Sequence, residues 1–207
     1  MKTTKKALLL ALCAVLLVVS TVFATLAYLT SETQVVRNTF TVGEIEITLD
    51  EAKVDLYGKV VAGADRVFEN EYKLIPGHKY VKDPTIHVAK GSEECYLFVK
   101  VVNGISAIEA DTTIADQMAA KGWVALTGVE NVYYLNKKID ASAAAVDVPV
   151  FAEFIVKGNA VVSNYVTAKD ESGDVADDAI VIDVTAYAVQ ADGFGTAQAA
   201  WTATFGA

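Results

Sequence analysis

An alternating pattern of apolar and polar residues within residues 179–190 constrains the fold more than any other feature of this chain. Asp183, Thr185 and Tyr187 occupy one parity of the segment. The other parity is apolar from residue 180 to residue 188: Ile180, Ile182, Val184, Ala186 and Ala188. Because successive side chains of a strand point to opposite faces, this pattern predicts a long β-strand with one face on a core.

Other segments read as strands separated by turn signals. Residues 95–102 are apolar on both faces except at Lys100, which is typical of a central strand covered on both sides. Residues 80–88 read as a strand that Asp83 and Pro84 interrupt. Further candidates are residues 40–50, residues 148–156 as strand or mixed structure, and the two arms of a hairpin at residues 123–126 and 131–139.

Helical patterning is confined to short segments. Residues 107–121 are the main candidate, with an apolar stripe of Ile108, Ile114 and Met118, a cap at Asp111 and an end at Gly122. Residues 193–201 could form a second short helix. Many strands with one or two short helices predict a mainly β fold, an antiparallel jelly-roll-like β-sandwich.

The N-terminal region has the three parts of a secretory signal peptide. A basic start precedes an apolar run over residues 7–29, and small residues stand near Ala27. We expect a signal-peptide helix, cleavage between Ala27 and Tyr28, and three regions: a signal peptide (1–27), an extended segment (28–39) and a sandwich domain (40–207). The alternative is a retained membrane anchor, because a run of about 20 residues can span a bilayer.

The net charge and the cysteine content exclude some classes of function and of stabilisation. The formal net charge is −9, and loss of residues 1–27 removes three lysines and no acid, which takes the charge to −12. Such acidity argues against nucleic-acid binding and against adhesion to anionic lipid. After cleavage only Cys95 remains, so an exported domain of this kind must rely on core packing instead of a disulfide.

Residues with catalytic potential are sparse, and the sequence contains no Gly-x-Ser-x-Gly elbow and no phosphate-binding loop. His78 lies in a Pro-Gly turn, where an exposed histidine is expected, and His87 lies in a strand with a surface or packing role. No His-Glu-x-x-His motif is present. Cys95 is expected to be a buried, inert thiol. The acidic turn at residues 170–174 could collect calcium weakly, but it lacks the EF-hand spacing. We therefore expect a protein that is not an enzyme, with no catalytic, cofactor or metal residues.

Several short blocks together resemble the TasA/camelysin (CalY) family, exported proteins processed by the SipW-type signal peptidase of Gram-positive bacteria. The most specific block joins the leader exit to the first strand, Ala27-Tyr28-Leu29-Thr30 followed by Asn38-Thr39-Phe40-Thr41-Val42-Gly43. The other blocks are Leu74-Ile75-Pro76-Gly77, Lys82-Asp83-Pro84, Glu94-Cys95-Tyr96-Leu97, the hairpin from Trp123 to Tyr134, and Gln190-Ala191-Asp192-Gly193-Phe194 before Ala200-Trp201.

The resemblance implies a jelly-roll domain at the cell surface or in the biofilm matrix, where TasA-like members build fibres. It also implies that the extended N-terminal segment adds as a strand to a neighbouring subunit. Candidate strand-donor residues here are Tyr28, Leu29, Val35 and Val36. The expected partners are copies of the chain or related matrix subunits and a SipW-type signal peptidase, with membrane attachment only through an uncleaved signal peptide.

Three alternatives stay open at this point. Camelysin-like relatives have been described as cell-surface metallopeptidases, although this chain lacks the zinc motif. A second alternative is an adhesive surface module that never polymerises. In the third, residues 28–38 are a disordered leader to a monomeric domain.

Overall fold

The structure is a computed structural model that describes residues 44–110, 112–164 and 181–206, together with Lys6, Cys13, Val15 and Leu16. The chain separates into two units, Met1–Thr41 and Val42–Ala207. The four described residues of the first unit are helical and exposed. The predicted signal peptide, its cleavage site and the strand-donor residues otherwise lie outside the described residues.

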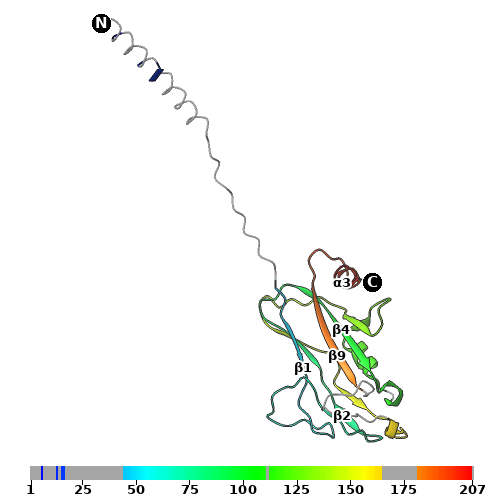
Figure 1. Ribbon diagram of the computed structural model, residues 1–207. Coiled ribbons are helices and arrows are strands. Elements are labelled where there is room, and N and C mark those ends of the chain that lie inside the picture. The colour runs from blue at the N-terminus through cyan, green and yellow to red at the C-terminus, as the bar shows by residue number, and fades with distance from the viewer. Residues whose placement is uncertain are drawn as a thin grey trace. The chain divides into compact units, whose positions relative to one another are not determined.

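The second unit is mainly β, as predicted, and its described residues form nine strands in three antiparallel sheets (Figure 1). One sheet has the order β1 (Ile47–Asp50), β3 (Thr85–Val88) and β7 (Val146–Pro149). A two-stranded sheet pairs β2 (Lys79–Val81) with β8 (Glu153–Ile155). The four-stranded sheet has the order β5 (Trp123–Ala125), β6 (Val132–Leu135), β4 (Cys95–Asn103) and β9 (Ile182–Gln190).

The predicted interruption at Pro84 is confirmed and marks a change of sheet. β2 ends at Val81 and pairs with β8, whereas β3 starts at Thr85 and pairs with β1 and β7. The segment that pairs with β2 and β3 also changes sheet opposite Pro84, between β7 and β8. Val150 and Phe151 in this connection are both fully buried. Residues 148–156 are therefore two strands joined by a buried crossing.

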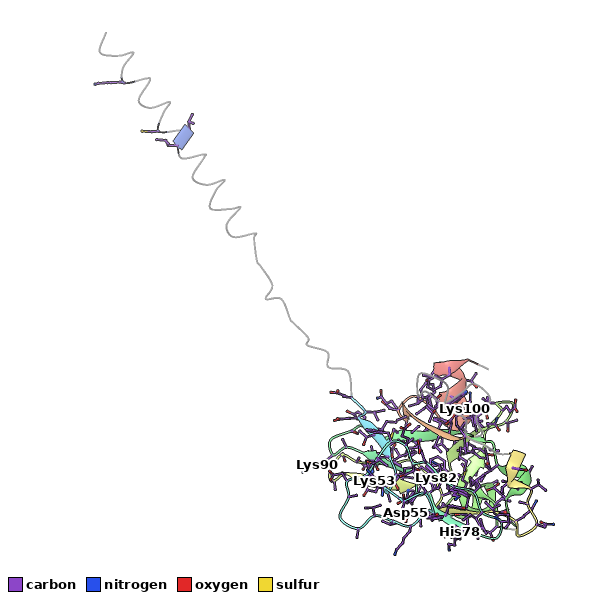
Figure 2. The ribbon with its side chains drawn as sticks, turned by 60° about the horizontal axis from the view of Figure 1, so that its bottom comes forward. Lys53, Asp55, His78, Lys82, Lys90 and Lys100 are labelled. Atoms are coloured by element: carbon purple, nitrogen blue, oxygen red, sulfur yellow. The ribbon has the colours of Figure 1, made fainter. Side chains whose placement is uncertain are left out.

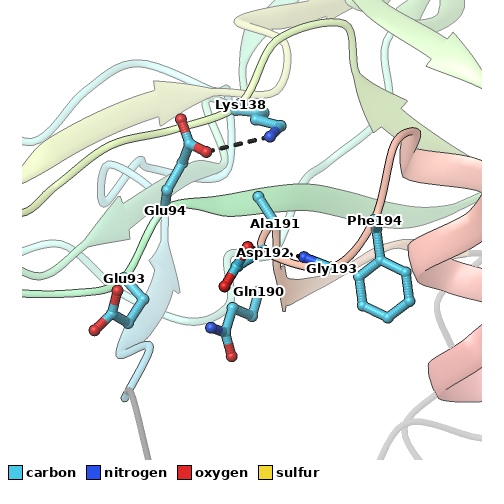
Figure 3. A pocket seen from close by; sticks show the side chains of 8 residues that line it. All are labelled: Glu93, Glu94, Lys138, Gln190, Ala191, Asp192, Gly193 and Phe194. Carbon is cyan, nitrogen blue, oxygen red and sulfur yellow. Dashed lines mark hydrogen bonds and ion pairs between the residues drawn. The ribbon is translucent and has the colours of Figure 1, made fainter.

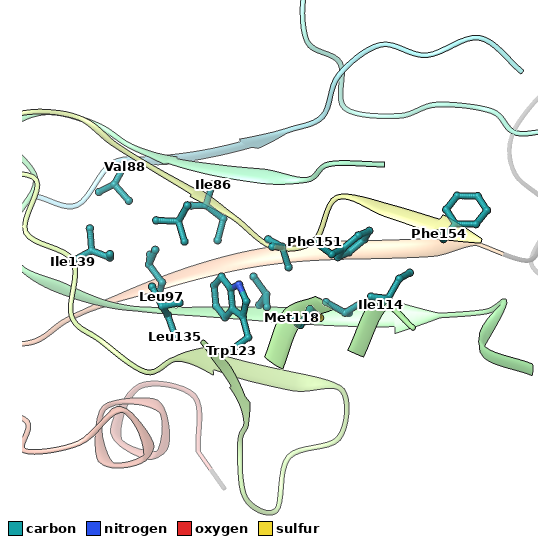
Figure 4. Packing of buried hydrophobic residues seen from close by; sticks show 14 of the residues in the cluster. Ile86, Val88, Leu97, Ile114, Met118, Trp123, Leu135, Ile139, Phe151 and Phe154 are labelled. Carbon is teal, nitrogen blue, oxygen red and sulfur yellow. The ribbon is translucent and has the colours of Figure 1, made fainter. Parts of the chain in front are cut away.

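The four-stranded sheet is covered on both faces, which explains the apolar composition of β4. Leu97 and Val99 face a core that all three sheets share (Figure 4). Tyr96 and Phe98 face a second core, beneath helix α3 (Ala197–Phe205). The alternation predicted for residues 179–190 is confirmed within β9, because Ile182, Val184, Ala186 and Ala188 pack on the shared core. Ile180 lies outside the described residues.

The helix predicted over residues 107–121 is interrupted. A 3-10 turn, η1 (Ser106–Ile108), is followed by α2 (Ile114–Ala120), whose cap is Thr113. Thr113 and Asp116 cap each other reciprocally. Glu109 forms an isolated β-bridge with Val156, and this bridge holds the backbone at residue 109 extended, so one helix cannot run through the segment. The predicted cap, Asp111, lies outside the described residues.

Candidate functional site: two open strand edges

Among the described residues, β9 has a hydrogen-bonded neighbour on one side only. On one side it pairs with β4 through nine residue pairs, from Gln190 opposite Cys95 to Ile182 opposite Asn103. No described residue pairs with its other side. In an antiparallel ladder, alternate residues bond to opposite neighbours. Ala191 donates to Glu94 and Gly104 donates to Val181, so the odd residues of β9 bond to β4. The even residues therefore direct their N–H and C=O groups to the open edge.

β1 is a second edge strand, open over a shorter length. Ala89 donates to the carbonyl of Glu46, so the even residues of β1 bond to β3. The backbone groups of Ile47 and Leu49 point to the other side, where no described residue pairs with them. At the end of β1 the edge closes, because Glu51 exchanges two hydrogen bonds of 2.8 Å with Val67.

The two open edges lie beside each other, at the same margin of the sandwich (Figure 1). We call this margin the β1/β9 seam and define it by the core-facing residues of the two strands: Ile47, Leu49, Ile182, Val184, Ala186 and Ala188. All six are only partly buried, although they pack on the shared core. Leu97 and Val99, on the adjacent β4, are fully buried. The core is thus less well covered at the seam than at the centre of the sheet.

An extended segment at this margin would contact unpaired backbone groups and partly exposed apolar side chains. The unpaired backbone groups of an edge strand are a template for a further strand. Alternate apolar side chains of such a strand would cover the exposed part of the seam residues. Ala186 and Ala188 are short side chains at core-facing positions, and they are the sequence signal that could have identified the seam.

The two histidines have more partners than the sequence indicated. His78 is partly buried instead of exposed; its Nε2 lies 2.8 Å from the carbonyl oxygen of Tyr57, and its ring contacts Tyr80 edge-on. His87, on the outer face of β3, lies between two carboxylates. Its Nδ1 is 2.7 Å from Asp147 on β7 and its Nε2 is 2.9 Å from Asp50 on β1.

Cys95 is fully buried in β4, as predicted. Burial, with a smaller effect of Glu94, raises the pKa of this thiol to about 11. The thiol is therefore protonated at neutral pH and unsuited to act as a nucleophile or a metal ligand.

A small acidic pocket lies where β9 ends. It is lined by Glu93, Glu94, Lys138 and residues 190–194 (Figure 3). Lys138 pairs with Glu94 at 3.2 Å and lies over the ring of Tyr96. Within the described ranges, no group of three or more His, Cys, Asp or Glu side chains is arranged to hold a metal ion. The acidic turn at residues 170–174 lies outside those ranges.

No described helix is long and apolar enough to cross a bilayer. Comparison with protein-family models, with curated proteins and with solved structures finds no match to this chain. A proposal about function therefore rests on the geometry above and on the sequence.

Proposed function

We propose that this protein is a secreted, non-catalytic structural subunit of the cell surface or biofilm matrix, and that it assembles into fibres by head-to-tail strand donation. The β1/β9 seam is the observation that carries the proposal, because it combines open backbone edges with an incompletely covered core. Signal peptidase cleavage after Ala27 would free residues 28–38 as the donor. The resemblance to the TasA/camelysin family supports the same assignment.

The dimensions of donor and acceptor agree. Residues 28–38 span about 36 Å when fully extended, and nine residues of β9 span about 30 Å. Leu29 and Val35 share a parity, so both can face the core while Val36 faces outward. Each subunit gives one segment and receives another, so the contact is head-to-tail and need not close, which produces a filament.

The test compares a chain starting at Tyr28 with one starting at Phe40, by electron microscopy and by size-exclusion chromatography. We expect fibres from the first, in a concentration-dependent manner, and monomers from the second. Equal polymerisation of the two would disprove the donor role. A Tyr28 chain that stays monomeric at all concentrations would indicate pairing within one subunit or an adhesive module.

A matched pair of substitutions locates the donor face. Val35→Asp places a charge on the face that would be buried, so we expect loss of fibres. Thr30→Asp lies on the opposite parity and should leave assembly intact. A casein assay of the same samples with added zinc and with chelator addresses the metallopeptidase alternative, and sustained zinc-dependent turnover would contradict a purely structural role.

A further inference from the structure

Glu51, in the connection between β1 and β2, contacts both a lysine and an asparagine. Its Oε2 lies 2.8 Å from the Nζ of Lys82, and its Oε1 accepts a 2.9 Å hydrogen bond from the Nδ2 of Asn70. The Glu51 and Lys82 side chains are only 5% and 11% exposed. Lys82 lies toward the middle of the domain in Figure 2, in contrast to Lys90 at its margin. One shielded carboxylate thus binds an amine through one oxygen and a carboxamide through the other.

The carboxamide of Asn70 is fixed and polarised by the backbone. Its Oδ1 accepts a 2.9 Å hydrogen bond from the N–H of Val54, and its Nδ2 donates to the carbonyl of Ala52 at the same distance. A donor aimed at the carbonyl oxygen stabilises the negative charge that develops there when a nucleophile adds to the carbon. Asn70 is therefore oriented as an electrophile, with Nδ2, the potential leaving group, on Glu51.

The surroundings of the three side chains exclude much of the solvent. Tyr72 packs against the shared core, and the Nζ of Lys82 lies 5.9 Å from the centre of its ring. Burial, together with the Glu51 and Asp83 carboxylates, raises the pKa of the Tyr72 phenol. A simple ion pair would require only Lys82 and Glu51. Asn70 completes the set of groups needed for amide exchange.

We infer that Lys82 and Asn70 form an intramolecular isopeptide bond, with Glu51 as the catalytic proton carrier. The reaction is a transamidation and needs no oxidant, cofactor or second substrate. It would link the segment that follows β1 to the end of β2 covalently. The inference is independent of the proposed fibre assembly.

Glu51, Lys82 and Asn70 supply every proton and bond that the reaction needs. Glu51 takes a proton from the Lys82 ammonium, and the neutral Nζ attacks Cγ of Asn70. The Nζ–Cγ bond forms and the carbonyl oxygen becomes an oxyanion facing the Val54 N–H. Glu51 then gives its proton to Nδ2 and accepts a second proton from Nζ. The Cγ–Nδ2 bond breaks and ammonia leaves, taking the last proton from Glu51 as ammonium.

The direct test is peptide mass spectrometry of the folded full chain after denaturation and digestion with trypsin. Trypsin does not cut at an acylated lysine. A linked chain therefore yields residues 67–73 joined to residues 80–90, lighter than the two peptides together by one ammonia. This readout does not depend on processing of the N-terminus. Recovery of residues 67–73 and 80–82 as separate peptides from the wild-type protein would overturn the inference.

Variants separate the roles of the three residues. Lys82→Arg keeps the charge but removes the nucleophile, and Asn70→Ala removes the electrophile, so we expect complete loss of the linked peptide in both. Glu51→Gln keeps the shape of the carrier and should reduce linkage at least tenfold; unchanged linkage would overturn its assigned role. The matched control is Lys79→Arg, at an exposed lysine that pairs with Glu153, and it should leave linkage unchanged.

Discussion

At the scale of the residue, Gly58 leaves almost no room for a side chain. Its φ is +73°, and a Cβ built there would lie 2.6 Å from the Cα of Tyr80, which is fully buried. Gly63 has a similar φ of +75° with nothing within 4 Å of a Cβ. Substitution at Gly58 therefore combines backbone strain with a clash against a rigid backbone atom, whereas substitution at Gly63 causes strain alone.

We predict that Gly58→Ala lowers the free energy of unfolding by roughly 3 kcal/mol, from strain and overpacking together. Gly63→Ala should lower it by about 1 kcal/mol, from the positive φ. Urea denaturation of both variants measures the difference. Equal losses in the two would mean that the approach of Gly58 to Tyr80 contributes nothing.

The burial of an individual residue could be predicted where the local sequence pattern determines it. The burial of Cys95 follows from its place in a continuous apolar strand. The contacts of His87 and Lys82 could not be predicted, because their partners are distant in sequence. His87 meets Asp147 across 60 residues, and Lys82 meets Glu51 across 31. Only the register of the strands brings such pairs together.

At the scale of the element, His87 connects all three strands of its sheet. A carboxylate oxygen is only an acceptor, so both ring nitrogens must carry a proton for both contacts to be hydrogen bonds. The hydrogen bonds to Asp50 and, after an opposing effect of burial, to Asp147 raise the pKa of His87. Arg66 also pairs with Asp50, and with Asp83 at 3.0 Å, so the edge strand β1 remains partly held when His87 is neutral.

The raised pKa predicts the direction of a pH effect. A group whose pKa is higher in the folded state than in the unfolded state stabilises the folded protein. This stabilisation is complete below the pKa of the unfolded state, about 6.5 for histidine, and is lost as the pH rises through the pKa of the folded state. We expect His87→Gln to remove about 1 kcal/mol of stability near pH 5.5 and much less near pH 8.5. Urea denaturation of the wild type and the variant at both pH values measures this difference.

His78→Gln is the matched control, because the ring of His78 contacts a carbonyl oxygen and an aromatic ring instead of two carboxylates. It serves as the comparison for removal of a histidine that contacts no carboxylate. A wild-type protein whose stability does not fall from acidic to alkaline pH, or a His87→Gln variant with the wild-type profile, would contradict the connecting role of His87.

Strands were easier to predict than helix boundaries in this chain. The alternating pattern located β9, a run that is apolar on both faces located β4, and the proline at residue 84 divided β2 from β3. The helical segment was predicted too long because Ile108 and Ile114 fit one apolar stripe. A non-local bridge between Glu109 and Val156 divides it. Sequence periodicity cannot report such a bridge, since it depends on which strand lies alongside.

At the scale of the whole molecule, the shared core is less well covered at the β1/β9 seam than at the centre of the four-stranded sheet. α3 covers the outer face of the four-stranded sheet, and the shared core fills its inner face. At the β1/β9 seam, two adjacent edges leave backbone groups without a described partner. The sequence predicts the strand β9, but the edge position of β9 and its closeness to β1 are properties of the topology.

Hydrogen exchange at single amides of β9 tests the central claim most directly. The amides of Ile182, Val184, Ala186 and Ala188 point to the open edge, whereas those of Asp183, Thr185 and Tyr187 bond to β4. We predict that in single subunits the first group exchanges at least tenfold faster than the second, and that assembly into fibres protects the first group to the level of the second. Fibres in which the even amides of β9 still exchange rapidly would contradict strand addition at this edge.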